Sequence, residues 1–184
     1  MIRMKKEASL KLKKGGLDTI VAYIVVMLPL FYVLVYMIAT IYHFSVQQYV
    51  SQVVKEACVM ASTYGGITSQ HENYIYGKLE KVARRPDTVK KDFEVSYYVR
   101  KFNPASGVVA NELKQITTGF NGDGMLNGIE KGDIIGIYVI STDDNPSLLG
   151  TVGNFNVFMF GREPRNSLKY AAYREEIIRN ERNQ

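Results

Sequence analysis

The segment 119–130 has the residue spacing of an EF-hand-type calcium loop. With Gly119 as position 1, Gly124 falls at position 6, where such loops turn sharply. The side chains at positions 3, 5, 9 and 12, which would supply oxygen ligands, are Asn121, Asp123, Asn127 and Glu130. However, a glycine at position 1 brings no carboxylate, and a strand pattern follows instead of a helix. A calcium site and a plain Gly/Asn/Asp turn are therefore two open interpretations of this segment.

Two further side chains could do chemistry, and each also has a structural interpretation. Cys58 is the one cysteine of the chain, so no intrachain disulfide can form. A lone thiol is usually a small buried side chain, with pairing between two chains as the alternative. His71 stands beside Glu72 with no nucleophile close to it in the sequence. Because no catalytic motif occurs either, we expect a protein that is not an enzyme and needs no cofactor, calcium apart.

The positive net charge is concentrated in one short stretch. The chain has a formal net charge of +5, and its first 16 residues carry six Lys or Arg against the single acid Glu7. The remainder therefore sums to zero, from which we expect no basic face and no nucleic-acid partner. A basic tail that precedes an apolar run is instead a signal of membrane topology.

Residues 19–54 contain no Asp, Glu, Lys or Arg, and residues 20–41 are the most apolar part. About 20 apolar residues are enough to cross a bilayer as a helix. The sequence thus predicts a single-pass membrane protein in contact with the lipid bilayer. Because the basic flank precedes the span, we expect residues 1–16 in the cytoplasm and the C-terminal part outside the cell. Within the span, Pro29 should kink the helix, and the small residues Ala22 and Ala39 could support packing against other helices.

The helix is expected to continue beyond the membrane, over residues 17–66 in total. Small and apolar residues recur at spacings of three and four between 45 and 64, as in an amphipathic helix, and Gly65-Gly66 then ends it. Residues 67–184 should form an α+β domain outside the membrane. We expect helices over 68–84 and 168–179, strands over 93–99, 133–141 and 154–160, and a strand that opens near 148–152. The outer half of the long helix is the expected cover of a small antiparallel sheet.

This layout resembles the TadE-like and pilin-like membrane proteins of secretion loci and conjugative elements. The resemblance is carried by Lys13-Lys14-Gly15-Gly16, by Met27-Leu28-Pro29-Leu30 and by the helix end at residues 53–62. It implies a pilin-like fold and a non-enzymatic subunit or assembly component of a pilus, secretion or conjugation apparatus. It also implies self-association, or association with other pilin-like subunits, through the N-terminal helix.

The same resemblance implies cleavage between Gly16 and Leu17 by a prepilin-type peptidase. Val21 stands where prepilins usually carry a glutamate, which favours a component that stays in the membrane over a major pilin. The alternative interpretation of the whole chain is a single-pass membrane protein whose outer domain binds a ligand, with calcium as the candidate.

Overall fold

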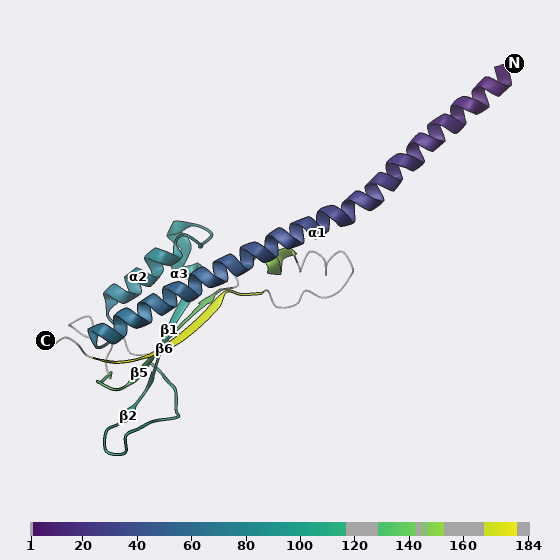
Figure 1. Cartoon of the computed structure of the whole chain (residues 1–184). Coiled ribbons are helices and arrows are strands. Elements are labelled where there is room, and N and C mark those ends of the chain that lie inside the picture. Colours follow the sequence, from purple (N-terminus) through teal and green to yellow (C-terminus); the bar gives the residue numbers. More distant parts are fainter. Residues whose placement is uncertain (1, 117–128, 143–144, 146, 153–167, 180–184) are drawn as a thin grey trace. The chain divides into compact units, whose positions relative to one another are not determined.

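The computed structural model describes residues 2–116, 129–142, 145, 147–152 and 168–179, with residues 2–17 described by their backbone alone. The chain divides into two units, Met1–Ile41 and Tyr42–Gln184, and helix α1 (Ile2–Tyr64) contributes to both (Figure 1). Helix α1 from Val46 onward belongs to the core of the second unit.

Helix α1 differs from the expected helix at one end and agrees with it at the other. It begins at Ile2 instead of near residue 17, so the basic tail is helical, in keeping with its content of Lys, Leu, Met and Ala. It ends at Tyr64, where Gly65 adopts a positive φ of 79° and the Gly66 N–H donates to Ala61 O at 2.9 Å. This is the glycine-dependent ending that the sequence predicts.

The second helix, α2 (Ser69–Leu79), ends five residues earlier than the predicted helix over 68–84. At its start the His71 Nδ1 accepts a hydrogen bond from the Thr68 N–H at 3.0 Å, which satisfies a backbone donor that the helix leaves free. Turns follow, then the 3₁₀ helix η1 (Pro86–Thr88) and the short helix α3 (Val89–Asp92). Pro86 cannot continue a helical hydrogen-bond ladder, which suits this break.

A four-stranded antiparallel sheet forms the other layer of the second unit. Its strands are β4 (Lys114–Gln115), β1 (Phe93–Arg100), β5 (Ile134–Ser141) and β6 (Ala171–Ile177), in that spatial order. Strands β1 and β5 pair over their whole length, from Phe93 opposite Ser141 to Arg100 opposite Ile134. Between β1 and β4 in the chain, β2 (Phe102–Asn103) and β3 (Val108–Val109) form a separate two-stranded hairpin. Its turn contains Gly107 at φ 65°. The sheet confirms the predicted α+β class and the strands over 93–99 and 133–141.

Three expectations for the last third of the chain have different outcomes. The predicted helix over 168–179 is wrong, because this segment is strand β6 and pairs with β5 from Ile134–Ile177 to Ile140–Ala171. The predicted strand opening near 148–152 is also wrong, since these residues form a helical turn. The predicted strand over 154–160 lies outside the described residues.

The core lies between the helices and one face of the sheet (Figure 1). Helix α1 supplies its buried face at helical spacing, with Val46, Val50, Val53, Ala57 and Ala61. Alternate residues of β1 and β5 face it, and these include Phe93, Ile135, Ile137 and Val139. The outer half of the long helix therefore covers the sheet, as the amphipathic pattern predicts.

Side chains of α1 also reach the outer edge of β6. The side-chain amide of Gln47 bonds both backbone groups of Ala171: its Nε2 donates to Ala171 O, and the Ala171 N–H donates to its Oε1 at 3.2 Å. Near the other end of the strand, the Ser62 hydroxyl donates to Ile177 O. Since β6 is the last strand in the sheet order, these bonds satisfy backbone groups that no other strand of the described residues pairs.

Candidate functional site

The first unit presents an apolar helical surface. Large apolar side chains between residues 20 and 41 are exposed, with Phe31 at 67% and Leu28 at 64% of full exposure. Within the described residues, one helix, Asp18–Tyr64, is long and apolar enough to cross a membrane by length and composition. In water such a surface would be costly, since burying each large apolar side chain is worth about 1.5–3 kcal/mol. The segment is therefore compatible with a single-pass membrane anchor.

Several polar side chains of this apolar segment share one helical face with Pro29. Pro29, Tyr32, Tyr36 and Thr40 follow one another at spacings of three and four, which places them on the same helical face. The rings of Tyr32 and Tyr36 stack with centroids 6.4 Å apart, and the Thr40 hydroxyl donates to Tyr36 O at 2.8 Å. Pro29 has no N–H, so the helix loses one backbone hydrogen bond there.

The residues expected to support helix packing do not have the same surroundings. Ala22 and Pro29 are exposed, whereas Ala39 is fully buried. Ala22 lines a shallow apolar hollow on the helix surface together with Thr19, Tyr23 and Val26. Of the three residues, only Ala22 and Pro29 therefore stand on the exposed helix surface.

The candidate processing residues Gly16 and Leu17 lie inside α1, and the backbone on both sides of them is helical. A peptidase that cuts between them would have to open the helix locally, since a helical backbone keeps its peptide groups in the intrahelical ladder. Processing at this bond stays a prediction.

Most of the candidate calcium loop lies outside the described residues, namely Asn121, Asp123 and Asn127. Glu130 is described: its side chain is exposed, and its Oε1 lies 3.8 Å from Lys101 Nζ. Among the residues that the structure describes, no group of three His, Cys, Asp or Glu side chains could hold a metal ion. Calcium binding thus also stays a prediction.

A buried carboxylate that sequence reasoning did not single out lies directly after this loop. Asp133 accepts hydrogen bonds from Lys101 Nζ at 2.8 Å and from the backbone N–H groups of Phe102 at 2.9 Å and Glu130 at 2.8 Å. Burial alone would raise the pKa of Asp133, but these hydrogen bonds outweigh it and lower the pKa below its usual range. The bonded Asp133 therefore joins Glu130 to Lys101 and Phe102 of another segment, which is a structural role.

Cys58 and His71, the other candidates for chemistry, both have structural partners. Cys58 is fully buried, and its thiol donates to Arg174 O at 3.2 Å. Burial raises the pKa of this thiol to about 12, which suppresses the reactive thiolate. The ring of His71 bonds Thr68 and lies edge-on to Tyr64, with centroids 5.3 Å apart.

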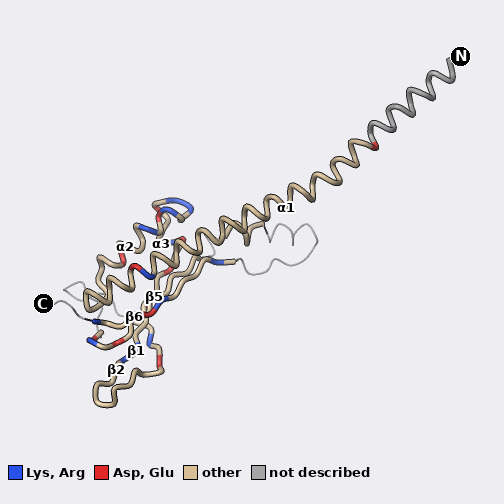
Figure 2. Tube along the Cα trace, viewed as in Figure 1, with Lys and Arg blue, Asp and Glu red and all other residues tan. Residues whose placement is uncertain are grey.

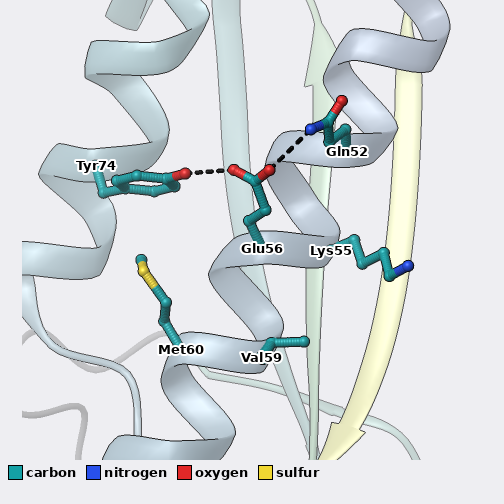
Figure 3. A pocket seen from close by; sticks show the side chains of 6 residues that line it. All are labelled: Gln52, Lys55, Glu56, Val59, Met60 and Tyr74. Atoms are coloured by element: carbon teal, nitrogen blue, oxygen red, sulfur yellow. Dashed lines mark hydrogen bonds between the residues drawn. The ribbon is translucent and has the colours of Figure 1, made fainter.

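An open groove of about 490 Å³ runs between α1 and α2 in the second unit. Its lining residues are Gln52, Lys55, Glu56, Val59, Met60 and Tyr74 (Figure 3). The Tyr74 hydroxyl donates to Glu56 Oε2, and Gln52 Nε2 donates to Glu56 Oε1 at 2.9 Å. These hydrogen bonds lower the pKa of Glu56, and the bond to Glu56 raises the pKa of Tyr74 to about 12. The groove therefore contains a hydrogen-bonded carboxylate, Glu56, beside the apolar side chains of Val59 and Met60.

A second hollow, of about 280 Å³, lies on the face of the sheet that turns away from α1. Its lining residues are Tyr98, Leu113, Tyr138 and Tyr173. The rings of Tyr98 and Tyr173 meet edge-on with centroids 6.2 Å apart, and the Tyr173 hydroxyl donates to Glu175, which also pairs with Arg100 at 2.8 Å. This hollow is an aromatic surface with a mixed-charge rim.

Comparisons with protein families, with curated proteins and with solved structures give no match to this chain. Its function is therefore inferred from the sequence and from the geometry described above.

Proposed function

We propose that this protein is a membrane-anchored, non-enzymatic, pilin-like component of a pilus, secretion or conjugation apparatus. One observation carries the proposal: an exposed apolar helical segment over residues 20–41 is joined to an α+β unit whose core uses the continuation of the same helix. A segment of this length and composition suits a bilayer span. The small helix-covered sheet suits the layout that the sequence resemblance implies.

The surroundings of the reactive side chains support a structural role. The thiol of Cys58 is buried and its pKa is raised, while His71 caps a helix. Neither group faces the groove or the aromatic hollow, whose lining residues are given above. In this proposal the folded unit binds other proteins and does not transform a substrate.

Self-association through the span is part of the proposal. The hydroxyls of Tyr32 and Tyr36 face the same side as Pro29, near the middle of the apolar segment. A polar group in the hydrocarbon is stabilised by a partner on another helix, and small side chains such as Ala22 permit close approach. A second copy, or another pilin-like subunit, would supply those partners.

The intact mass and the N-terminal sequence of the protein extracted from its native membrane test the proposal. We expect the chain to resist extraction by alkaline buffer and to keep residues 1–16. A chain that starts at Leu17 would mean prepilin-type processing and would change the proposed role to that of a filament subunit. Release into the soluble fraction by alkaline buffer would contradict the membrane anchor itself.

Orientation and association need two further measurements. Protease added to sealed cells or inside-out vesicles should digest residues 42–184 only from the outer side, if the basic flank is cytoplasmic. Crosslinking through cysteines introduced at Ala22 or Pro29 should trap dimers, while a cysteine at Phe31, which is exposed on the opposite side of the helix, should do so less. Equal crosslinking at all three positions would contradict a specific packing face.

A further inference from the structure

The second unit has an uneven charge distribution that the zero sum of its charges conceals. Five cationic side chains are exposed within an eleven-residue stretch, and we call this stretch, residues 81–91, the basic loop. They are Lys81, Arg84, Arg85, Lys90 and Lys91. Figure 2 shows this stretch as a concentration of blue beyond the end of α2. The zero sum of the charges does not reveal this local concentration of cations.

The basic loop contains a single acidic side chain, the exposed Asp87. The exposed Glu80 directly precedes the loop, and the buried Asp92 follows it. The Asp92 Oδ2 accepts the Arg84 N–H and the Thr88 hydroxyl, both at 2.8 Å. The carboxylate of Asp92 thus holds the loop from inside, while the cationic side chains are exposed, with Lys90 Nζ 5.2 Å from the ring centroid of Tyr76. The resulting surface is complementary to anions.

Three contacts between α2 and α1 locate the basic loop within the second unit. The His71 ring meets the Tyr64 ring at 5.3 Å, the Tyr74 hydroxyl bonds Glu56, and the Tyr49 hydroxyl donates to Lys78 O at 3.0 Å. As the residue numbers rise along α2, the residue numbers of its contact partners on α1 fall. Helix α2 therefore runs antiparallel to α1, and the basic loop that follows it lies at the Tyr42 end of the unit.

That end of the unit follows the apolar segment directly in the chain. Tyr49, which contacts the end of α2, is seven residues beyond Tyr42, or about 10 Å along a helix. The headgroup layer on one side of a bilayer is about 5–8 Å thick. Charges interact without strong screening over about 8 Å at physiological ionic strength. The long side chains of the basic loop are therefore within reach of a headgroup layer that begins near Tyr42.

We propose that the basic loop binds anionic phospholipid headgroups of the same bilayer that holds the apolar segment. This inference rests on the proposed membrane anchor. The loop would fasten the folded unit to the membrane surface as a second contact, so that one end of the unit faces the lipid. Charge complementarity and the position next to the end of the span both support this occupant.

The test uses the full chain in lipid nanodiscs and acetylation of lysines, read by mass spectrometry. Discs contain phosphatidylcholine alone or phosphatidylcholine mixed with phosphatidylglycerol. Acetylation of Lys81, Lys90 and Lys91 should fall about fivefold in the anionic discs, and high salt should restore it. Lys114 and Lys131, which are exposed outside the loop, serve as internal controls whose acetylation should not change.

A pair of variants separates the basic loop from charge in general. The double variant Arg84→Gln/Arg85→Gln keeps the three reporter lysines and should lose most of their protection. The matched double variant Lys114→Gln/Lys131→Gln removes the same number of charges elsewhere and should keep it. Circular dichroism checks that both variants keep the fold of the parent chain, and all four side chains lie at the surface.

Several outcomes would overturn the inference. Equal acetylation in the two kinds of disc would mean that the basic loop does not touch the membrane. Protection in neutral discs by inorganic phosphate or by an RNA oligonucleotide would mean that another anion is the ligand. A chain that does not co-elute with neutral discs on gel filtration would contradict the proposed membrane anchor, and this outcome is distinct from the failure of lipid binding by the basic loop.

Discussion

Replacing Gln47 by leucine tests whether α1 holds the outer edge of the sheet. The Gln47 amide bonds both the carbonyl and the N–H of Ala171, and leucine has similar bulk but can do neither. The two backbone groups would then be left without partners in a half-buried position. An unsatisfied buried polar group costs about 1–3 kcal/mol, and partial access of water lessens this, so we expect a loss of about 1–2 kcal/mol.

The assay is denaturant unfolding of the full chain in detergent micelles, followed by circular dichroism, together with hydrogen exchange at the Ala171 amide. The matched control is Gln48→Leu, one residue further along α1 with an exposed side chain. It should change the free energy of unfolding by less than about 0.5 kcal/mol. Exchange at Ala171 should accelerate in Gln47→Leu and remain unchanged in Gln48→Leu.

A second substitution, Gln47→Glu, sharpens the test through pH. A carboxylate can accept from the Ala171 N–H but cannot donate to Ala171 O, and its charge would face that oxygen. The variant should therefore be weakest at neutral pH and recover as acid protonates the glutamate, which can then donate. Equal stability of Gln47→Leu and Gln48→Leu, with unchanged exchange at Ala171, would refute the role assigned to Gln47.

Three other predictions concern single sites in the second unit. Burial lowers the pKa of His71, so the unfolded chain binds more protons than the folded chain near pH 6. The contribution of His71 to stability should therefore be complete above about pH 6.5 and fall as the pH drops. His71→Gln should flatten this part of a pH–stability profile. Phe93→Ala empties a fully buried core position and should cost about 3–5 kcal/mol in chemical unfolding, whereas Phe93→Leu should cost less than half of that. Gly132→Ala should lower the free energy of unfolding by about 1–2 kcal/mol, because Gly132 has φ 91° and a Cβ would lie 2.8 Å from Phe102 Cδ1. In Gly136→Ala the exposed ring of Tyr173 can rotate away from the new Cβ. This variant should therefore change the near-UV circular dichroism more than the stability. A larger loss of stability in Gly136→Ala than in Gly132→Ala would contradict this assignment.

The parts of the fold that depend on local pattern could be predicted from the sequence. The uncharged run of residues 19–54 specifies a long apolar helix by length alone, and the spacing of Val46, Val50 and Val53 identifies its buried face. The alternation from Phe93 to Val99 gives strand β1 with its inward and outward sides. Gly65 marks the end of α1, because a positive φ there is easiest for glycine.

The parts that depend on distant partners could not be predicted. Residues 171–177 have the composition of a helix, yet they pair with β5, a strand more than thirty residues earlier in the chain. Tertiary pairing overrides local propensity at this site. The role of Asp133 also escapes a sequence reading, because Lys101 and Phe102 reach it from another segment.

The basic loop shows a limit of charge arithmetic. The zero net charge over residues 17–184 predicts no basic face, but a net charge does not tell where the charged residues lie. Asp92 is buried beneath the loop while Lys90 and Lys91 are exposed. The run of cations between Lys81 and Lys91 was visible in the sequence, and counting charge in short windows would have found it.

The bonds between α1 and β6 also set the order in which the protein can assemble. Gln47 and Ala171 are 124 residues apart, and Ser62 and Ile177 are 115 residues apart. At 5–20 residues per second, a ribosome needs about 6–25 seconds to make the chain between Gln47 and Ala171. Throughout this interval the apolar stripe of α1 has been synthesised, but the strand that completes its sheet has not. A nascent chain that stalls before Ala171 would thus carry a complete anchor and a core helix that its sheet covers only in part, a state in which chaperones and proteases can recognise it.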